Sequence, residues 1–309
     1  MELLLLARGG DGGGDDLEFH GPQVLDLSSQ KRSMRAWRDA TREESGLRLA
    51  VIGKPVAQSL SPKMQSAALR ELGVAGSYEA FEVEPEELRD CLSHLADCGF
   101  RGVNVTIPYK SPVAALCELE GSEAIETGCV NTVQFGEKWV GRNTDVAGFL
   151  HPIRTWPPGE ALLIGAGGAA EAAAYALLTS GWSVSLWNRT AERAEELARR
   201  FSRFGSIQAL VTPEEASADL VVSAIPAPGE ENVFPVRFET LSRSAAIYDL
   251  AYAEGGTRLT RWAIEAGRRV VDGREMLVEQ GALALEWWTG LTAPRPVMRA
   301  AIGLPPQEI

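Results

Sequence analysis

The sequence predicts an α/β protein made of two consecutive α/β units, and three observations support this prediction. From Leu47 onward, apolar runs of strand length alternate with helix-length stretches. A second alternation of the same kind begins at Ala161, and its first turn is rich in glycine. With 309 residues, of which 45% are hydrophobic, the chain is long enough for two domains with separate cores. We place the junction of the two units near residue 148.

The first unit is predicted to contain three strands and two helices. The strands are residues 47–53, 76–83 and 102–108, and the helices are residues 61–72 and 85–99. Because strands and helices alternate, we expect these strands to form a sheet of the parallel type.

The second unit repeats this order. A strand with the glycine-rich turn occupies residues 161–168, and an alanine-rich helix follows at 171–181. The later elements are a strand at 182–188, a helix at 191–201, and apolar segments at 219–225 and 244–252.

Residues 1–46 differ from the rest of the chain. GGDGGGDD and the polar stretch after it offer little that a core could bury, so we expect a disordered N-terminal extension. Two alternatives stay open: MELLLL could add an edge strand, and Met34 could be the start of the protein.

Composition excludes several classes of function. A net charge of −12 argues against nucleic acid and anionic membranes as main partners. No run approaches the ~18 apolar residues of a membrane span and no secretory signal is recognisable, so we expect a cytoplasmic protein. The four cysteines show no CxxC spacing, which argues against a metal site and a disulfide framework. Because the chain has only three histidines, we expect any catalytic acid or base to be Lys, Asp, Glu or Tyr.

The glycine-rich turn of the second unit matches G-x-G-x-x-A at Gly165, Gly167 and Ala170. An ordinary glycine turn can produce this pattern, but here a strand precedes it and a long helix follows. In that setting Gly165 permits the tight turn and Gly167 lets the backbone approach a pyrophosphate at the helix N-terminus. The sequence therefore predicts a dinucleotide site.

The end of the next strand indicates which dinucleotide binds. NAD sites usually place Asp or Glu there for the ribose 2′-hydroxyl, whereas this chain has Asn188, Arg189, Thr190 and Arg193. Two arginines favour a 2′-phosphate, so we predict NADP rather than NAD. Thr190 also fits the N-cap of the following helix, which does not explain the arginine before it.

Polar residues recur at chain reversals of the first unit. Ser59 and Ser61 alternate on one face before a helix, where Ser61 fits the N-cap with Pro62 in the first turn. The alternative is a cradle for a carboxylate beside the helix N-terminus.

A second polar group follows an apolar strand. Asn104 and Thr106 share one face of this strand, and Lys110 lies at its carboxyl end, where open α/β sheets bind ligands. GCVNT and GRNTD add Asn131 and Asp145, and a carboxylate beside Lys110 can orient its ammonium for proton exchange. A helix cap is the other reading of Asp145.

Seven motifs in this order resemble the shikimate dehydrogenase family over residues 47 to about 292: GKPVAQSLSP, GVNVTIPYK, GCVNT, NTDVAGF, IGAGGAA, NRT and MLVEQGALALEWWTG. The resemblance implies a substrate-binding catalytic domain (47–147 plus 275–309) and an NADP-binding Rossmann domain (148–274) with a cleft between them. It also implies the reversible reduction of 3-dehydroshikimate to shikimate, a step in aromatic amino acid (chorismate) biosynthesis.

The resemblance assigns roles residue by residue. Lys110 is the acid/base, partnered by Asp145. The substrate residues are Ser59, Ser61 and Thr106 for the carboxylate and Asn131, Asp145 and Gln280 for the ring hydroxyls, with Asn104 and Tyr252 nearby. The cofactor residues are Gly165, Ala166, Gly167, Gly168, Ala169, Asn188, Arg189, Thr190 and Arg193. No metal ligand is expected, because the cysteines show no metal-binding spacing.

The chain departs from the family pattern at several positions. Glu171 stands where Arg often follows the glycine loop, SAIPAPG replaces an Asn-Ala-Thr segment, Gln58 replaces His, and Gln65-Ser66 replaces His-Asn. The first two bear on cofactor affinity and the nicotinamide pocket. Two alternatives remain: a quinate/shikimate dehydrogenase that uses NAD, and a non-catalytic ligand-binding homologue. The oligomeric state also stays open, with a homodimer as one alternative.

Overall fold

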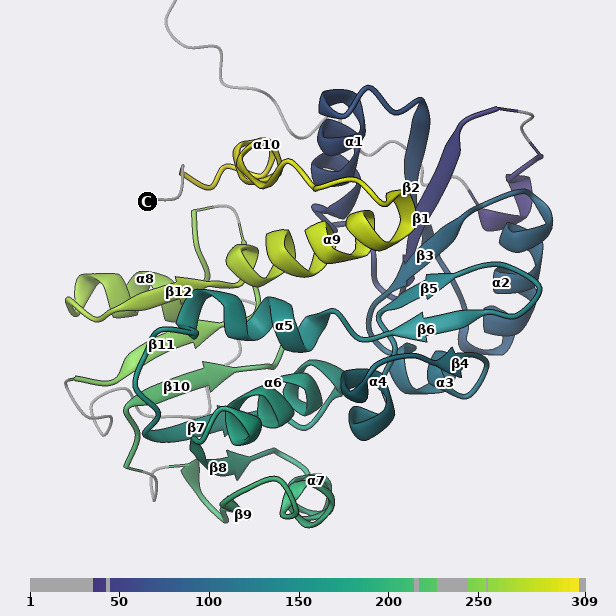
Figure 1. The fold of residues 1–309 in the computed structure, drawn as a ribbon. Helices are drawn as coiled ribbons and strands as arrows, with labels where there is room; N and C mark the ends of the chain where they lie inside the picture. The colour runs from purple at the N-terminus through teal and green to yellow at the C-terminus, as the bar shows by residue number, and fades with distance from the viewer. Residues whose placement is uncertain (1–35, 43–44, 214–216, 227–243, 254, 306–309) are drawn as a thin grey trace, which may run out of the picture. The chain divides into compact units, whose positions relative to one another are not determined.

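The computed structural model describes residues 36–42, 45–213, 217–226, 244–253 and 255–305. Figure 1 shows two sheets with helices packed on them, which confirms the predicted α/β fold class. Among the described residues, no helix combines the length and apolar character that crossing a membrane requires.

The first sheet is mixed rather than parallel. It has six strands in the order β2-β1-β3-β5-β6-β4. Their bounds are β1 Leu47–Gly53, β2 Gly76–Glu82, β3 Gly102–Val105, β4 Glu118–Leu119, β5 Thr132–Gln134 and β6 Val140–Arg142. β1 pairs in parallel with β2 and β3, but β5 runs antiparallel to both β3 and β6. The three predicted strands therefore pair in parallel, as expected, but the antiparallel strands that make the sheet mixed were not predicted, because β5 and β6 are short and partly polar, without an apolar run to mark them.

β1 is apolar from Leu49 to Ile52 because both of its faces are covered. Leu49 and Val51 face a core that includes helix α1 (Ser61–Glu71), and Ala50 and Ile52 face a core that includes helix α2 (Leu88–Asp97). The described part of this half also has three short α-helices, α3 (Lys110–Ala114), α4 (Ser122–Thr127) and α5 (Asp145–Leu150), and the 3-10 helices Trp37–Asp39, Pro85–Glu87 and His151–Ile153.

The last two helices return to the first sheet. Helix α9 (Gly273–Thr289) and helix α10 (Arg295–Ala301) contribute apolar side chains to the core beside α1. The indole of Trp288 donates to the carbonyl of Val133 in β5 at 3.0 Å. The chain's C-terminal helices therefore lie on a sheet built from its first half.

The second sheet is parallel and has the order β12-β11-β10-β7-β8-β9. Its strands are β7 Glu160–Ile164, β8 Ser183–Trp187, β9 Ile207–Ala209, β10 Leu220–Ser223, β11 Ala246–Asp249 and β12 Val270–Asp272. The order reverses between β7 and β10, as in Rossmann sheets, and ligands of such sheets bind at this switch point.

Alanine brings helix α6 (Gly168–Thr179) close to the second sheet. Ala170, Ala172, Ala173, Ala174 and Ala176 are fully buried in one core with strands β7, β8 and β10. Helix α7 (Ala191–Phe201) packs in the same core, and helix α8 (Arg258–Glu265) contributes to the core on the opposite face.

Part of the expected N-terminal extension is ordered. Trp37 is buried, its ring packs edge-on against His94, and the carbonyl of Ala40 lies 3.0 Å from His94 Nε2 on α2. The prediction of disorder was therefore wrong for residues 36–42, because Trp37 packs in an apolar core with residues of α2. The remainder of the predicted extension lies outside the described residues, except for Gly46 and Ser45 before β1.

Candidate active site

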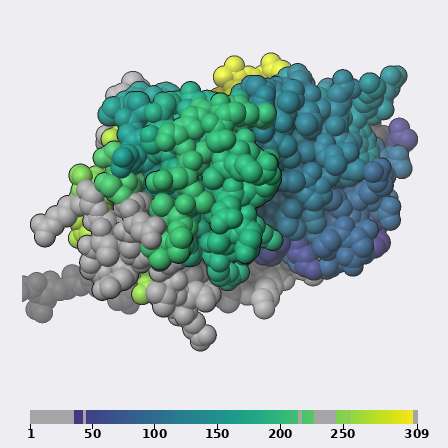
Figure 2. All heavy atoms as spheres, turned by 90° about the horizontal axis from the view of Figure 1, so that it is seen from below, coloured from purple at the N-terminus to yellow at the C-terminus, as the bar shows by residue number. Residues whose placement is uncertain are grey.

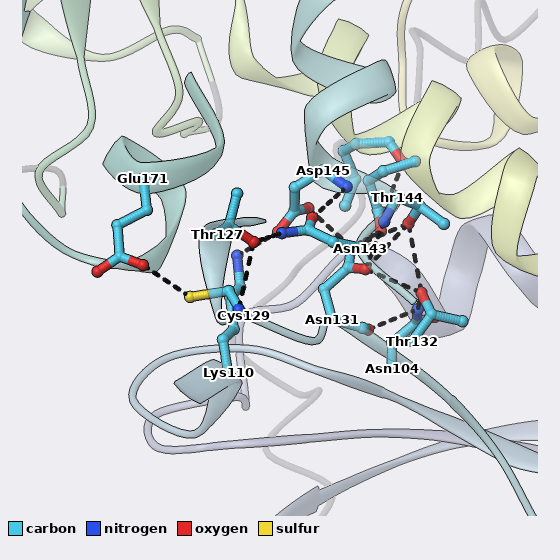
Figure 3. A network of polar contacts seen from close by, with 12 residues as sticks. Asn104, Lys110, Thr127, Cys129, Asn131, Thr132, Asn143, Thr144, Asp145 and Glu171 are labelled. Atoms are coloured by element: carbon cyan, nitrogen blue, oxygen red, sulfur yellow. Dashed lines mark hydrogen bonds and ion pairs between the residues drawn. The ribbon is translucent and has the colours of Figure 1, made fainter. Parts of the chain in front are cut away.

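Lys110 and Asp145 form an ion pair at the centre of the polar network in Figure 3. Lys110 begins helix α3, and its Nζ donates to Asp145 Oδ2 at 2.5 Å. The two side chains are 11% and 7% exposed. The predicted pair is therefore together and largely shielded from water, which strengthens its mutual attraction.

Asn131 holds the carboxylate of Asp145 in place. Its Nδ2 donates to Asp145 Oδ1 at 2.8 Å and lies 3.2 Å from Gln280 Oε1 of α9. Its Oδ1 accepts the backbone N–H of Thr144 at 2.8 Å. Four of the predicted residues thus meet in one network: Lys110, Asn131, Asp145 and Gln280.

Asp145 does not serve as a helix cap. It is the first residue of α5, and Thr144 occupies the N-cap position without a side-chain capping bond. Instead, the side chain of Asn143 accepts the backbone N–H of Asp145 at 3.1 Å. The turn is thus closed by Asn143, which leaves the Asp145 carboxylate free to face Lys110.

Gly148 lets α9 approach α5 closely. A Cβ at this position would lie 2.8 Å from the Cβ of Gln280 and 3.1 Å from the carbonyl oxygen of Met276. Real Cβ atoms do not tolerate such distances, so a larger residue here would displace α9. The glycine of NTDVAGF therefore helps to place Gln280.

Tyr78 joins the site, although the sequence analysis missed it. Its buried hydroxyl donates to Asn104 Oδ1 at 2.7 Å, and Asn104 Nδ2 donates to Thr132 Oγ1 at 3.0 Å and to the carbonyl of Asn131 at 3.1 Å. Burial raises the pKa of Tyr78 well above its ordinary value, and the Ser61 side chain acts in the opposite direction. The available signal was a tyrosine in a strand with buried positions, since a buried phenol usually needs a partner.

Ser59 and Ser61 lie near two tyrosines, but Ser61 does not cap α1. The helix begins at Ser61 with Leu60 at the N-cap position, and Ser59 Oγ accepts the backbone N–H of Ser61 at 3.3 Å. The predicted Ser61 cap is wrong because the chain enters the helix one residue earlier. Burial raises the pKa of Tyr252, while the Leu60 backbone and the Ser59 side chain lower it, so Tyr252 faces this turn.

Thr106 lies one residue beyond β3. It is half-buried, and its methyl group fills the space beside Gly53, where an added Cβ would lie 2.3 Å from Thr106 Cγ2. The expected strand 102–108 thus ends at Val105, and Thr106 sits at its carboxyl end.

The glycine loop has the geometry expected of a dinucleotide site. Gly165 adopts a φ of +116°, and a Cβ there would lie 3.0 Å from the carbonyl oxygen of Ala224 after β10. Gly167 occupies the N-cap position of α6 with no side-chain cap, and a Cβ there would meet none of the described atoms within 4 Å. The loop of Gly165, Ala166, Gly167, Gly168 and Ala169 therefore presents a helix N-terminus beside open space.

The same loop touches Lys110. A Cβ on Gly168 would lie 3.1 Å from Lys110 Cδ and 3.5 Å from Cys129 Sγ. The acid/base candidate therefore lies directly against the start of α6.

The four residues predicted to bind a 2′-phosphate follow β8. Arg189, Thr190 and Arg193 are exposed, and Asn188 Nδ2 donates to the carbonyl of Thr190 at 2.8 Å. Thr190 is at the N-cap position of α7 but makes no side-chain capping bond. Within the described ranges, neither guanidinium has a hydrogen bond or ion pair, so both are available to an anion.

A buried carboxylate closes the loop after β11. Asp249 is 3% exposed, accepts from Thr257 Oγ1 at 2.6 Å, and accepts the N–H of Ala251 at 3.2 Å. Burial raises the pKa of Asp249 from 3.8 to about 6, against the opposing effect of hydrogen bonds from Thr257, Ala251 and Ser223. The bonds from Thr257 and Ala251 span the loop that carries Tyr252.

The shifted pKa of Asp249 predicts a pH dependence of stability. Between the unfolded pKa of 3.8 and the folded pKa of about 6, the folded state holds the proton more tightly, so stability falls as pH rises. The difference corresponds to about 3 kcal/mol. Relative to Asp249→Asn, the wild type should lose most of this difference, about 2 kcal/mol of free energy of unfolding, between pH 4 and pH 6.5 in urea titrations. If the free energy of unfolding of the two proteins changed equally with pH, the raised pKa of Asp249 would be contradicted.

Three family models match the chain. The shikimate dehydrogenase substrate binding domain matches residues 51–133, and the shikimate / quinate 5-dehydrogenase model matches residues 154–243. The shikimate 5'-dehydrogenase C-terminal domain matches residues 273–302.

Individual relatives cover most of the chain. It is 42% identical over 263 residues to a protein of Archaeoglobus fulgidus named shikimate dehydrogenase (NADP(+)), covering 82% of this chain and 97% of that protein. The crystal structure of shikimate 5-dehydrogenase from Thermus thermophilus in complex with NADP(H) and shikimate matches at 40% identity with a TM-score of 0.74, covering 82% and 98% of the two chains. Quinate dehydrogenase from Corynebacterium glutamicum in complex with NAD matches at 27% identity with a TM-score of 0.75, covering 83% and 98%.

Proposed function

The chain belongs to the shikimate dehydrogenase family, and we propose on that basis that it catalyses the reversible, NADP-dependent reduction of 3-dehydroshikimate to shikimate. The family membership predicted from the seven ordered motifs is thereby confirmed. One observation carries the proposal: the Lys110–Asp145 ion pair lies against Gly168, where the dinucleotide loop enters α6.

Lys110 is the acid/base that transfers the proton of the reaction. In the direction of reduction, its Nζ donates a proton to the substrate oxygen that becomes the hydroxyl, and in oxidation the same nitrogen accepts that proton. Asp145 orients the ammonium through the 2.5 Å contact, and Asn131 keeps the carboxylate in that orientation. When bound, the nicotinamide supplies or accepts the hydride.

The proposal assigns the substrate residues to two groups. Ser59, Ser61 and Thr106 would bind the substrate carboxylate through their hydroxyls, and Tyr252 faces the turn that carries Ser59. Asn131, Asp145 and Gln280 would bind the ring hydroxyls, and Asn104 lies beside Asn131. Support comes from the hydrogen bonds that already join Asn131 to both Asp145 and Gln280.

The residues present fit NADP. The helix N-terminus at Gly167 and the open space beside it suit a pyrophosphate, and Arg189 with Arg193 suits a 2′-phosphate. Relatives at about 40% identity are named for NADP, which favours this cofactor over NAD. The departure SAIPAPG runs into residues 227–229, which lie outside the described residues.

The organisation of the protein is part of the same proposal. We assign residues 47–147 plus 275–309 to a substrate-binding domain and residues 148–274 to an NADP-binding domain. The cleft between these domains and the homodimer stay predictions. Four cysteines that are free thiols support a reducing compartment, and we place the enzyme in the cytoplasm.

One assay tests the function. Shikimate or quinate is the substrate, NADP or NAD is the cofactor, and the absorbance of the reduced cofactor, NADPH or NADH, is followed. Turnover of shikimate with NADP is the expected result. No turnover with any pair would favour the non-catalytic alternative, and preferred oxidation of quinate with NAD would favour the other enzyme.

The serine turn gives a prediction with two readouts. Ser59→Ala and Ser61→Ala should each raise KM for shikimate by about 10- to 100-fold, because each removes a hydrogen bond to a charged group. Ser59→Ala should also lower the melting temperature, since Ser59 Oγ accepts the N–H of Ser61, whereas Ser61→Ala loses no capping bond. Unchanged KM in both variants would assign the turn a structural role alone.

A further inference from the structure

Glu171 ties the dinucleotide helix to the substrate loop. It lies in the first turn of α6, its side chain is 13% exposed, and both carboxylate oxygens are engaged. Oε2 accepts from Cys129 Sγ at 3.1 Å, and Oε1 accepts from Arg200 Nη1 at 3.2 Å. Figure 3 shows Glu171 directed at Cys129, two residues before Asn131.

The Cys129 thiol acts as a hydrogen-bond donor in this contact. Burial raises its pKa to about 12, and the charge of Glu171 acts in the same direction, so the thiol stays protonated at neutral pH. Its sulfur also lies 3.3 Å from Ser111 Oγ, one residue after Lys110. The contact therefore fixes the loop between α4 and β5 directly beside the acid/base residue.

Arg200 provides a second connection from Glu171 to the site. Its Nη2 donates to the carbonyl of Thr127 at 2.9 Å, and Thr127 Oγ1 accepts from Asn143 Nδ2 at 3.0 Å. The side chain of Asn143 in turn accepts the N–H of Asp145. A chain of hydrogen bonds thus runs from the first turn of α6 to the carboxylate partner of Lys110.

A further ion pair joins the same two regions. Arg203, just beyond α7, pairs with Glu126 near the end of α4. Figure 2 shows the face on which the green surface of the second α/β unit meets the blue surface of the first. The Arg203–Glu126 ion pair thus joins the same two regions as the contacts of Glu171 and Arg200.

We propose that Glu171 is a positioning residue that couples cofactor binding at α6 to substrate binding at Asn131 and Asp145. The inference rests on the proposed function. A carboxylate at the start of a dinucleotide helix would repel phosphate, but Arg200 balances its charge and both oxygens face the substrate loop. A ligand that fixes the N-terminus of α6 then favours one arrangement of residues 127–131, and by linkage the substrate favours the same arrangement of α6.

The test is a binding cycle that excludes turnover. Shikimate and NADPH are both reduced and cannot react, so the dissociation constant of shikimate is measured calorimetrically without NADPH and at saturating NADPH. In the wild type, NADPH should tighten shikimate binding by at least about fivefold, the lower end of typical coupling. Glu171→Ala should reduce this factor to below about twofold, while binding of shikimate alone changes by less than about twofold.

Two further variants separate coupling from general damage. Glu171→Gln keeps an acceptor for Cys129 and should restore part of the coupling. Glu196→Ala is the matched control, because it removes an exposed carboxylate whose ion pair with Arg199 stays within α7. Its coupling should equal that of the wild type, and melting temperatures establish that all variants fold.

The outcomes separate the two proposals. Coupling in Glu171→Ala as large as in the wild type, or a wild type that binds both ligands without coupling, would overturn this inference alone. A wild type that binds no shikimate would overturn the proposed function and this inference with it.

Discussion

Lys110→Met is expected to lower kcat for shikimate oxidation by about 10²- to 10⁴-fold, the usual loss when a positioned acid or base is removed. KM for shikimate should stay within a few fold, because the carboxylate and the ring hydroxyls are held by other residues. Steady-state kinetics with NADP at saturation measures both constants.

Stability must be measured alongside this variant. Removing Lys110 leaves the buried carboxylate of Asp145 with the amide of Asn131 but without its cation. Such a loss can destabilise a protein strongly, so the melting temperature of the variant is compared with that of the wild type. Lys138→Met is the control, since Lys138 is 78% exposed and pairs with Glu118 at the surface. A folded Lys110→Met protein with near-normal kcat would mean that another group moves the proton.

The second large effect concerns cofactor choice. Arg189→Ala combined with Arg193→Ala should remove most of a preference for NADP over NAD that we expect to be roughly 10²- to 10⁴-fold. Two charge-assisted contacts to a 2′-phosphate, each contributing about 1.5 to 3 kcal/mol, account for that range. The measurement is kcat/KM with each cofactor, and kcat/KM with NAD should barely change.

The same helix supplies the control for this pair. Arg199 lies on α7 but pairs with Glu196 three residues earlier, so Arg199→Ala removes one positive charge away from the end of β8. It should leave the preference intact. Wild-type protein that uses NAD as well as NADP would refute the assignment of Arg189 and Arg193 and would favour the quinate alternative.

The sequence predicted the parts of the fold that have strong local signals. β1 contains an apolar run from Leu49 to Ile52 because both of its faces are buried, and the glycine loop was recognised because Gly165 and Gly167 lie between a strand and a helix. The Lys110–Asp145 pair was predicted from chemistry, since a protein with three histidines needs another acid or base near its polar residues.

Other parts depended on contacts that no local pattern encodes. The antiparallel strands β5 and β6 have three residues each, too few for a period to emerge. Tyr78 resembles any strand tyrosine until its hydroxyl meets Asn104. Glu171 was noticed as a departure from the family, but its meaning depends on Cys129 and Arg200, which are distant in sequence. The N-cap of α1 was assigned to Ser61 rather than Leu60, because serine and proline suit several positions of a first turn.

Because α9 packs closely against α5 at Gly148, the substrate site is complete only after α9 has been synthesised. A ribosome delivers Lys110, Asn131 and Asp145 before the second α/β unit, but Gln280 and the helices that cover the face of β1 beside α1 emerge after it. Until then, the nascent first half leaves Leu49 and Val51 without α9 and α10, so it exposes apolar surface that is prone to aggregation. The growing chain therefore carries an unfinished substrate site while the whole second α/β unit is synthesised, and α9 and α10 then complete the site and cover this surface together.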